Sequence, residues 1–144
     1  TPDKTKVWAN GTCVNVYSLA RDGEHYLLDN FQVKEFACQD GSDPVFIHVD
    51  LPQWCQLVRE KFGYPFSPNS AYRTVSHNEK PEVGGAMRSL HTYGMAVDIP
   101  AKGDTTPQML YDFFEEILGG SGELGIYDWG VHVAVSAAKK RFRG

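Results

Sequence analysis

Polar residues that could do chemistry interrupt two short apolar segments of the chain. Asp98 lies between apolar residues at the end of the stretch Ser89 to Asp98, which also contains His91 in a turn, and His132 lies in a second apolar segment. A carboxylate in such a setting is costly to bury without a partner, so we expect a cation to face Asp98. Two histidines and an aspartate from two strand regions would make a three-ligand zinc site with a fourth position for water.

Each of these residues also has a purely structural interpretation. A lone histidine in a strand is more often a satisfied core residue than a ligand, and Asp98 could form a buried salt bridge, for instance with Arg73. We expect His25 and His48 to be ordinary surface residues. The three cysteines are Cys13, Cys38 and Cys55. They lack the close spacing of a zinc or redox site, so we expect them to lie in the core or to form at most one disulfide.

Two segments have the apolar spacing and the capping residues of amphipathic helices. The first runs from Asp50, as N-cap, to Gly63, with a proline in its first turn. The second runs from Thr106 to Leu118, with Thr106 as N-cap and a Gly-Gly pair after it. We expect the aromatic residues of both helices to lie in the core.

Short apolar segments separated by Gly-, Pro- and Asn-containing loops predict the strands. Residues 7–28 suggest strands or a hairpin, and residues 30–38 resemble neither helix nor strand and are expected to be a tethering segment. Without a regular βαβ repeat, this mixture predicts an α+β fold, with a small antiparallel sheet and helices packed on one face. The strand candidates are Ser70–Thr74, Met95–Ile99 and Val131–Val135, with Leu124–Tyr127 leading into the last.

The composition fits one globular domain of 144 residues, with 42% hydrophobic and 22% charged residues, although residues 1–29 could be an extension. Such a domain needs no metal merely to fold. No apolar run reaches the roughly 20 residues of a membrane span, and the opening without methionine suggests a mature or excised piece. We expect a monomer.

The charge distribution argues against a nucleic-acid partner. Four of the 14 basic residues lie within the C-terminal residues 139–144, which leaves 10 basic against 18 acidic residues in the rest of the chain. We expect this basic tail to be a solvated terminus, with a short anion or membrane-surface contact as the alternative. The tail residues are Lys139, Lys140, Arg141 and Arg143.

The pattern Ser-x-His-x-x-Gly-x-Ala-x-Asp, formed by Ser89, His91, Gly94, Ala96 and Asp98, resembles the zinc-binding signature of a known family. That family is the D-alanyl-D-alanine carboxypeptidases and endopeptidases, which are peptidoglycan zinc peptidases. The resemblance covers roughly residues 30 to 144 and includes its phage-associated and bacterial branch. Further matching positions are Asn30 to Cys38, Ser70, Tyr72, Arg73, His77, Asn78, Val83 to Ala86, Gly125, Tyr127, Val131 and His132.

The resemblance implies a zinc ion held by His91, Asp98 and His132, whose water attacks a peptide carbonyl in a peptidoglycan stem peptide. It also implies the small α+β fold shared with the vancomycin-resistance dipeptidases and the hedgehog signalling domain. Arg73 is suited to stabilise the developing oxyanion or to hold a substrate carboxylate, and Ser89 to orient a ligand. The implied location is extracellular, in the cell envelope or phage-associated.

The sequence departs from the family where His132 is followed by Val-Ala-Val-Ser instead of Val-Asp-Val-Arg. The missing aspartate and arginine correspond to Ala134 and Ser136, so the alternative function is a zinc-holding, inactive module that binds cell wall or protein. Relatives place a catalytic group a few residues before the last ligand, where this chain has Trp129, and Asp128 is then the candidate general base. Tyr72, His77 and Trp129 are further candidates for binding substrate or lining the cleft, and structural hydrogen bonding is an equal alternative for His77.

Overall fold

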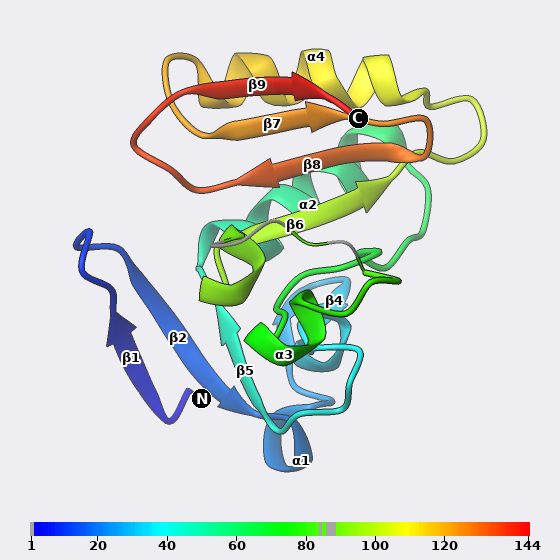
Figure 1. Cartoon of the computed structure of the whole chain (residues 1–144). Coiled ribbons are helices and arrows are strands. Elements are labelled where there is room, and N and C mark those ends of the chain that lie inside the picture. Colours follow the sequence, from blue (N-terminus) through cyan, green and yellow to red (C-terminus); the bar gives the residue numbers. More distant parts are fainter. Residues whose placement is uncertain (1, 84, 86–88) are drawn as a thin grey trace.

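The computed structural model describes residues 2–83, 85 and 89–144, and its largest sheet has four strands in the order β6-β8-β7-β9 (Figure 1). Strand β8 pairs antiparallel with both β6 and β7, and β9 joins β7 in parallel. Gly84 and Ala86, two positions of the family resemblance, lie outside the described residues. The strands are β6 (Ala96–Pro100), β7 (Glu123–Ile126), β8 (Gly130–Ala134) and β9 (Lys140–Arg143).

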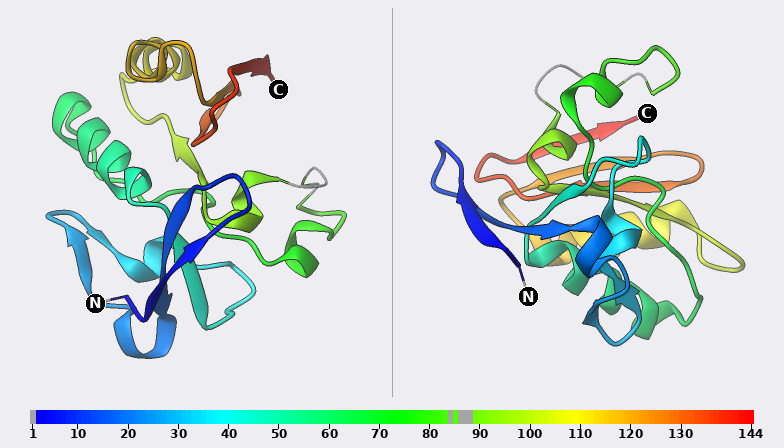
Figure 2. Two further views of the ribbon diagram at one scale, coloured as in Figure 1. Left: turned by 90° about the vertical axis from the view of Figure 1, so that its left-hand side faces the viewer. Right: turned by 90° about the horizontal axis from the view of Figure 1, so that it is seen from below.

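Two long helices, α2 (Asp50–Phe62) and α4 (Pro107–Leu118), lie on one face of this sheet (Figures 1 and 2). The Thr106 side chain accepts a hydrogen bond from the Met109 amide, which caps α4 as expected. The N-cap of α2 is Val49, so Asp50 stands inside the first turn and is not the predicted cap. The α+β fold with helices on one face of the sheet is confirmed.

The N-terminal part forms a second sheet, with three antiparallel strands in the order β1-β2-β5. The predicted Asn10-Gly11 turn joins β1 to β2, which confirms the hairpin. The Asp22-Gly23 pair instead ends a one-turn helix, α1 (Leu19–Asp22). The remaining strands of this part are β1 (Lys4–Val7), β2 (Cys13–Ser18), β3 (Tyr26–Leu28), β4 (Phe31–Gln32) and β5 (Pro44–Ile47).

The segment 30–38, expected to be a tether, belongs to the hydrophobic core. It forms the short strand β4 and then the 3-10 helix η1 (Val33–Phe36). Phe31, Val33 and Phe36 have no exposed surface. Because the chain changes from strand to 3-10 geometry within these few residues, no single hydrophobic period could reveal the element.

The predicted strand Ser70–Thr74 does not form. Only one isolated bridge remains, in which the Asp98 amide donates to the Ser70 carbonyl at 2.8 Å. The chain then turns into the short helix α3 (Val75–Asn78), whose N-terminus is capped by the Thr74 side chain. This irregular segment carries Arg73 past the edge of β6.

The basic tail is also different from the expectation, because it forms strand β9 and is not a solvated terminus. Arg141 donates to the Glu115 carboxylate of α4 and to the carbonyl groups of Gly119, Ser121 and Gly122. These contacts tie the last strand to the loop that follows α4. The tail therefore completes the sheet.

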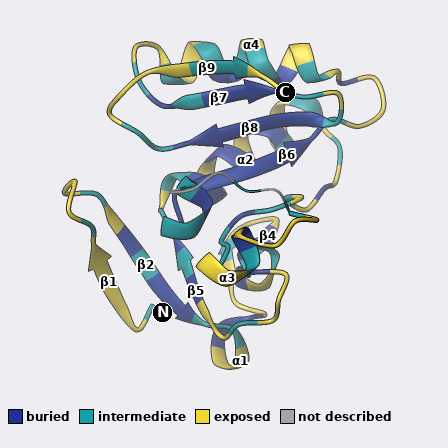
Figure 3. Ribbon diagram, in the orientation of Figure 1, coloured by how far each residue is buried: buried dark blue, intermediate teal, exposed yellow. Residues whose placement is uncertain are grey.

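One cluster of buried apolar residues joins the two sheets through α2. It includes Ile47 of β5, Trp54 of α2 and Val133 of β8. Strands β6, β7 and β8 are buried, whereas β1 is exposed (Figure 3). Cys38 and Cys55 are buried as expected and Cys13 is exposed, and all three thiols are free. None of the described helices is long and apolar enough to cross a membrane.

Candidate metal centre

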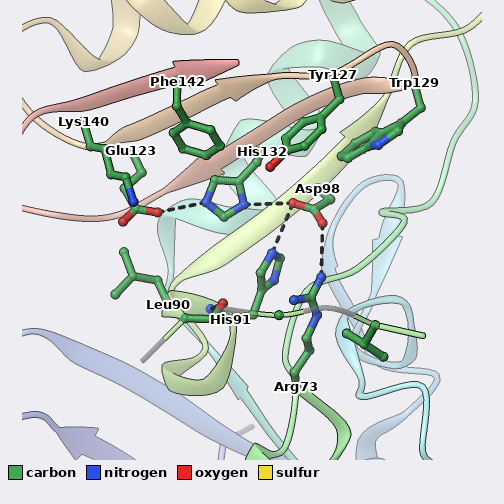
Figure 4. A pocket seen from close by; sticks show the side chains of 13 residues that line it. Arg73, Leu90, His91, Asp98, Glu123, Tyr127, Trp129, His132, Lys140 and Phe142 are labelled. Carbon is green, nitrogen blue, oxygen red and sulfur yellow. Dashed lines mark hydrogen bonds and ion pairs between the residues drawn. The ribbon is translucent and has the colours of Figure 1, made fainter. Parts of the chain in front are cut away.

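A cavity of about 470 Å³ opens on the side of the large sheet that the helices leave uncovered (Figure 4). Residues from η2 (Leu90–Tyr93), all four strands of the large sheet and the loop after β7 face into it. The lining residues are Arg73, Val83, Gly85, Ser89, Leu90, His91, Asp98, Glu123, Tyr127, Trp129, His132, Lys140 and Phe142.

The three predicted zinc ligands meet in this cavity, and we name His91, Asp98 and His132 the sheet cluster. Asp98 and His132 are direct partners in the β6/β8 register, so their side chains share one face of the sheet. The Asp98 Oδ1 atom lies 3.0 Å from His132 Nδ1 and 3.1 Å from His91 Nε2 (Figure 4). All three residues are buried, and their ligand atoms lie within 4.8 Å of one another.

A hydrogen bond on the far side of each imidazole fixes which nitrogen is free to bind a metal. His91 Nδ1 lies 2.6 Å from the Ala71 carbonyl oxygen, which can only accept, so Nδ1 carries the proton. His132 Nε2 lies 3.0 Å from the Glu123 carboxylate and donates to it. In the neutral rings, His91 Nε2 and His132 Nδ1 are therefore unprotonated and turned towards Asp98. Two such nitrogens and one carboxylate oxygen form a ligand set that suits Zn²⁺.

Strong electrostatic coupling marks the cluster. Burial alone would lower the pKa of His132, but its hydrogen bonds to Asp98 and Glu123 raise the pKa to about 9. Burial alone would raise the pKa of Asp98, but the His91 charge and the hydrogen bond from His132 lower it well below the usual range. A carboxylate that stays ionised between two imidazoles can bind a divalent cation, which then takes the place of the imidazole protons.

The signature residues around His91 have local structural roles. The Ser89 side chain caps η2 and accepts a hydrogen bond from the His91 amide at 3.2 Å, so it orients the segment that carries this histidine. Gly94 ends η2 with a φ of 72°, and a Cβ there would lie 2.4 Å from the Phe46 carbonyl oxygen. Only glycine fits both the left-handed conformation and this close approach.

Arg73 contacts the cluster as the expected cation facing Asp98. Its Nη2 lies 3.5 Å from Asp98 Oδ2, while Nε donates to Ser70 Oγ and Nη1 donates to Asn78 Oδ1. The side chain is 14% exposed and lines the cavity. Both interpretations of Arg73, as the ion-pair partner of Asp98 and as a group facing the cavity, therefore have their geometry in the structure.

The other candidates lie in different surroundings. Trp129 lines the cavity and stacks on Tyr127 with 4.9 Å between ring centroids. Tyr72 stacks on Phe46, and neither it nor Asp128 is among the cavity-lining residues. Asp128 is exposed. His77 lines a neighbouring cavity instead.

Sequence reasoning missed Glu123, Lys140 and Phe142, which complete the cavity wall from β7 and β9. Glu123 is the β7 partner of Ala134, so a carboxylate from the neighbouring strand stands beside the position where the family pattern has aspartate. The sequence does place Glu123 directly before the predicted strand segment 124–127. Its register opposite β8 could not be read from the sequence.

Two further histidines were expected on the surface. His25 is exposed, as predicted. The side chain of His48 is only 13% exposed, and its Nδ1 accepts a hydrogen bond from the Asp50 amide at the start of α2. Burial lowers the pKa of His48, which favours the neutral ring that this contact needs. His48 is therefore a structural residue of the helix N-terminus.

Comparison with known proteins gives one family. The family model described as Peptidase M15 matches residues 24–136, which is most of the chain and includes the whole sheet cluster. No curated protein gives a significant match.

Proposed function

Because this chain belongs to the peptidase M15 family of zinc peptidases, we propose that it hydrolyses a peptide bond in the stem peptides of peptidoglycan. The observation that carries the proposal is the sheet cluster, in which two imidazole nitrogens and one carboxylate converge in an open cavity. Three protein ligands with an accessible side are typical of catalytic zinc sites, whereas structural sites are closed by a fourth protein ligand.

His91, Asp98 and His132 would hold the zinc ion. Zinc bound there supplies Lewis-acid chemistry, since it lowers the pKa of a water molecule towards ~7 and polarises a carbonyl group. Glu123 keeps the proton of His132 on Nε2 and so leaves Nδ1 for the metal. In this role Glu123 replaces the carboxylate that the chain lacks at Ala134.

Arg73 and Lys140 contribute positive groups to the cavity. The planar Arg73 guanidinium can donate to a carbonyl oxygen as negative charge develops on it, or to a peptide carboxylate. Aromatic rings of Tyr127, Trp129 and Phe142 line the same cavity and offer apolar surface to small side chains such as alanine. This combination supports a D-Ala-D-Ala carboxypeptidase or a related endopeptidase.

The proposed substrate sets the proposed location and source. A peptidoglycan peptidase acts outside the cytoplasmic membrane, so we propose that the protein is extracellular, in the cell envelope or phage-associated, in a bacterial or phage context. We also propose that one domain and one subunit suffice, because every residue assigned a role above comes from a single chain.

The experiment is digestion of purified peptidoglycan by the zinc-loaded protein, with released fragments identified by mass spectrometry. Loss of a terminal D-alanine would identify a carboxypeptidase, and cleavage between stem-peptide residues or cross-links an endopeptidase. Asp98→Asn is the matched inactive variant. A protein that takes up less than about a tenth of an equivalent of zinc on reconstitution would contradict the proposal.

The second candidate function is a zinc-holding module that binds cell wall or protein without cleavage. Ala134 and Ser136, together with the exposed position of Asp128, favour it because none of them supplies a proton-transfer group to the cavity. The same digestion decides between the two functions. Retention on peptidoglycan without any released fragment would support the binding module.

A further inference from the structure

A second group of metal-ligating side chains lies outside the cavity of the sheet cluster. Cys38 and Asp40 follow η1, His77 belongs to α3, and their ligand atoms lie within 4.8 Å of one another. We name these three residues the loop cluster. None of them lines the 470 Å³ cavity.

The donor set of the loop cluster has a defined preference. A thiolate and an imidazole favour zinc and similar ions over calcium or magnesium, and a carboxylate adds negative charge. Cys38 is a free thiol with only 3% of its surface exposed. Asp40 is exposed, and its carboxylate accepts hydrogen bonds from the Ser42 amide and the Thr74 hydroxyl.

One nitrogen of the His77 ring has no hydrogen-bond partner among the described residues. This atom, Nδ1, is buried. A buried polar atom without a partner is costly, and native proteins satisfy nearly all of them. A bound ion would occupy a lone pair of this imidazole and fix its tautomer.

We propose that Cys38, Asp40 and His77 bind a second divalent metal ion of the zinc type, separate from the ion of the sheet cluster. With three protein ligands, a water molecule would complete tetrahedral coordination. Metal binding by the loop cluster does not depend on the proposed peptidase activity.

Thr74 connects the three ligands of the proposed site. Its amide donates to Cys38 Sγ at 3.4 Å, and its hydroxyl donates to Asp40 at 2.7 Å and accepts from the His77 amide at 3.2 Å. Thr74 directly follows Arg73 in the chain. An ion bound by the loop cluster would therefore brace the segment that positions Arg73 beside Asp98.

A neighbouring cavity of about 270 Å³ is lined by Arg73 and by one residue of each cluster. His77 lines this cavity together with Arg73, Asp98 and Trp129, which also line the larger cavity. Arg73 thus shares this cavity with His77 of the loop cluster and Asp98 of the sheet cluster. Ordering of its side chain by the second ion is the expected link between the clusters.

Titration of the full chain with Co²⁺ tests the proposal, because cobalt bound to a thiolate gives a charge-transfer absorption in the near ultraviolet. The sheet cluster contains no sulfur, so this absorption reports only a cysteine ligand. We expect a second equivalent of Co²⁺ to bind with this absorption, and both to be lost in Cys38→Ser. Cys55→Ser is the matched control, since Cys55 is also a buried free thiol whose pKa is raised by burial.

His77→Gln and Asp40→Asn keep the proposal testable if Cys38→Ser does not fold, as judged by circular dichroism. Loss or strong weakening of the absorption in His77→Gln, with the circular dichroism spectrum unchanged, supports the site. Native protein that binds cobalt without thiolate absorption would overturn it. The proposal would also be overturned by absorption that persists at native affinity in His77→Gln, or that disappears in the exposed-thiol variant Cys13→Ser.

Discussion

The sheet cluster and the loop cluster offer similar ligands on different supports. In the sheet cluster, Asp98 and His132 face each other across the β6/β8 ladder, and every ligand is buried. In the loop cluster, one ligand is buried, one is partly buried and one is exposed, and they belong to a loop and a one-turn helix. Residues on paired strands are held more rigidly than residues on loops.

This difference assigns different tasks to the two clusters. Each histidine of the sheet cluster is already oriented by a hydrogen bond on its far side, to Ala71 or Glu123. The ligands are thus arranged before an ion binds, and the open side faces a cavity that can hold substrate. The loop cluster is held together mainly through Thr74, so an ion there would add order to the segment instead of meeting a finished site.

The largest expected effect comes from a matched pair, Asp98→Asn and Asp40→Asn. Asp98→Asn should lose the zinc of the sheet cluster and lower activity by about 10³-fold or more, because a Lewis acid contributes several kcal/mol and about 1.4 kcal/mol is a factor of ten. Asp40→Asn should keep that zinc and most of the activity. Metal analysis and peptidoglycan digestion measure both. Equal losses in the two variants would contradict the separation of the clusters.

Arg73 contacts Asp98 of the sheet cluster and directly precedes Thr74, and its substitution gives the next largest effect. Arg73→Ala should lower turnover by about 10²–10³ with zinc content unchanged, because the guanidinium acts on charge that develops during the reaction. Arg73→Lys keeps the charge but not the planar fork, so it should recover only part of the rate. Turnover, zinc content and melting temperature are the measurements.

A different result would assign Arg73 to folding. If it serves only as the partner of Asp98, Arg73→Ala leaves a buried carboxylate with less compensation and should lower stability or release the zinc. Full activity of Arg73→Ala on a substrate that the native protein cleaves would also contradict the catalytic role.

Elements whose apolar residues follow one regular spacing were predictable from the sequence. Both long helices were recognised from their apolar spacing, and the Thr106 cap also marked the start of α4. The sheet-cluster ligands were also singled out, since a carboxylate or histidine in an apolar strand needs a partner. The structure brings these three side chains together.

The missed features depend on distant parts of the chain. Lys140 and Phe142 enter the cavity only because β9 pairs with β7 in parallel, and a four-residue basic strand carries no apolar alternation. Gly125 has no side chain, which leaves room for the Phe142 ring beside it; a Cβ there would lie 2.2 Å from the ring. Such pairing is set by tertiary packing and not by local propensity.

Glu123→Gln sharpens the comparison, because it removes the charge that orients a ligand of the sheet cluster while keeping the side-chain shape. We expect zinc affinity or activity to fall by about 10–100-fold, the usual effect of such an outer partner. Glu116→Gln, an exposed change on α4, is the matched control. Competition with a zinc chelator measures the affinity. An unchanged affinity and activity would show that Ala134 has no substitute carboxylate.

The metal-free protein should show the coupling of the sheet cluster as a pH dependence of stability. His132 has a pKa of about 9 when folded, above its ordinary value near 6.5, because its bonds to Asp98 and Glu123 outweigh burial. A raised pKa stabilises the fold fully below about pH 6.5, and this contribution is lost as pH rises to about 9. Urea unfolding of chelated protein at several pH values measures it, and chelated His132→Gln should lack this dependence.

The smallest effect should come from Lys140, an exposed cation that lines the cavity of the sheet cluster. Exposed charge pairs contribute at most about 1 kcal/mol, so Lys140→Ala should raise KM about twofold to fivefold for a substrate with a free carboxylate and leave kcat unchanged. High salt should remove the difference, because it screens exposed charges. Lys139→Ala is the matched control, since Lys139 is equally exposed but does not line the cavity. A lower kcat in Lys140→Ala would instead place this ammonium group at the reacting bond.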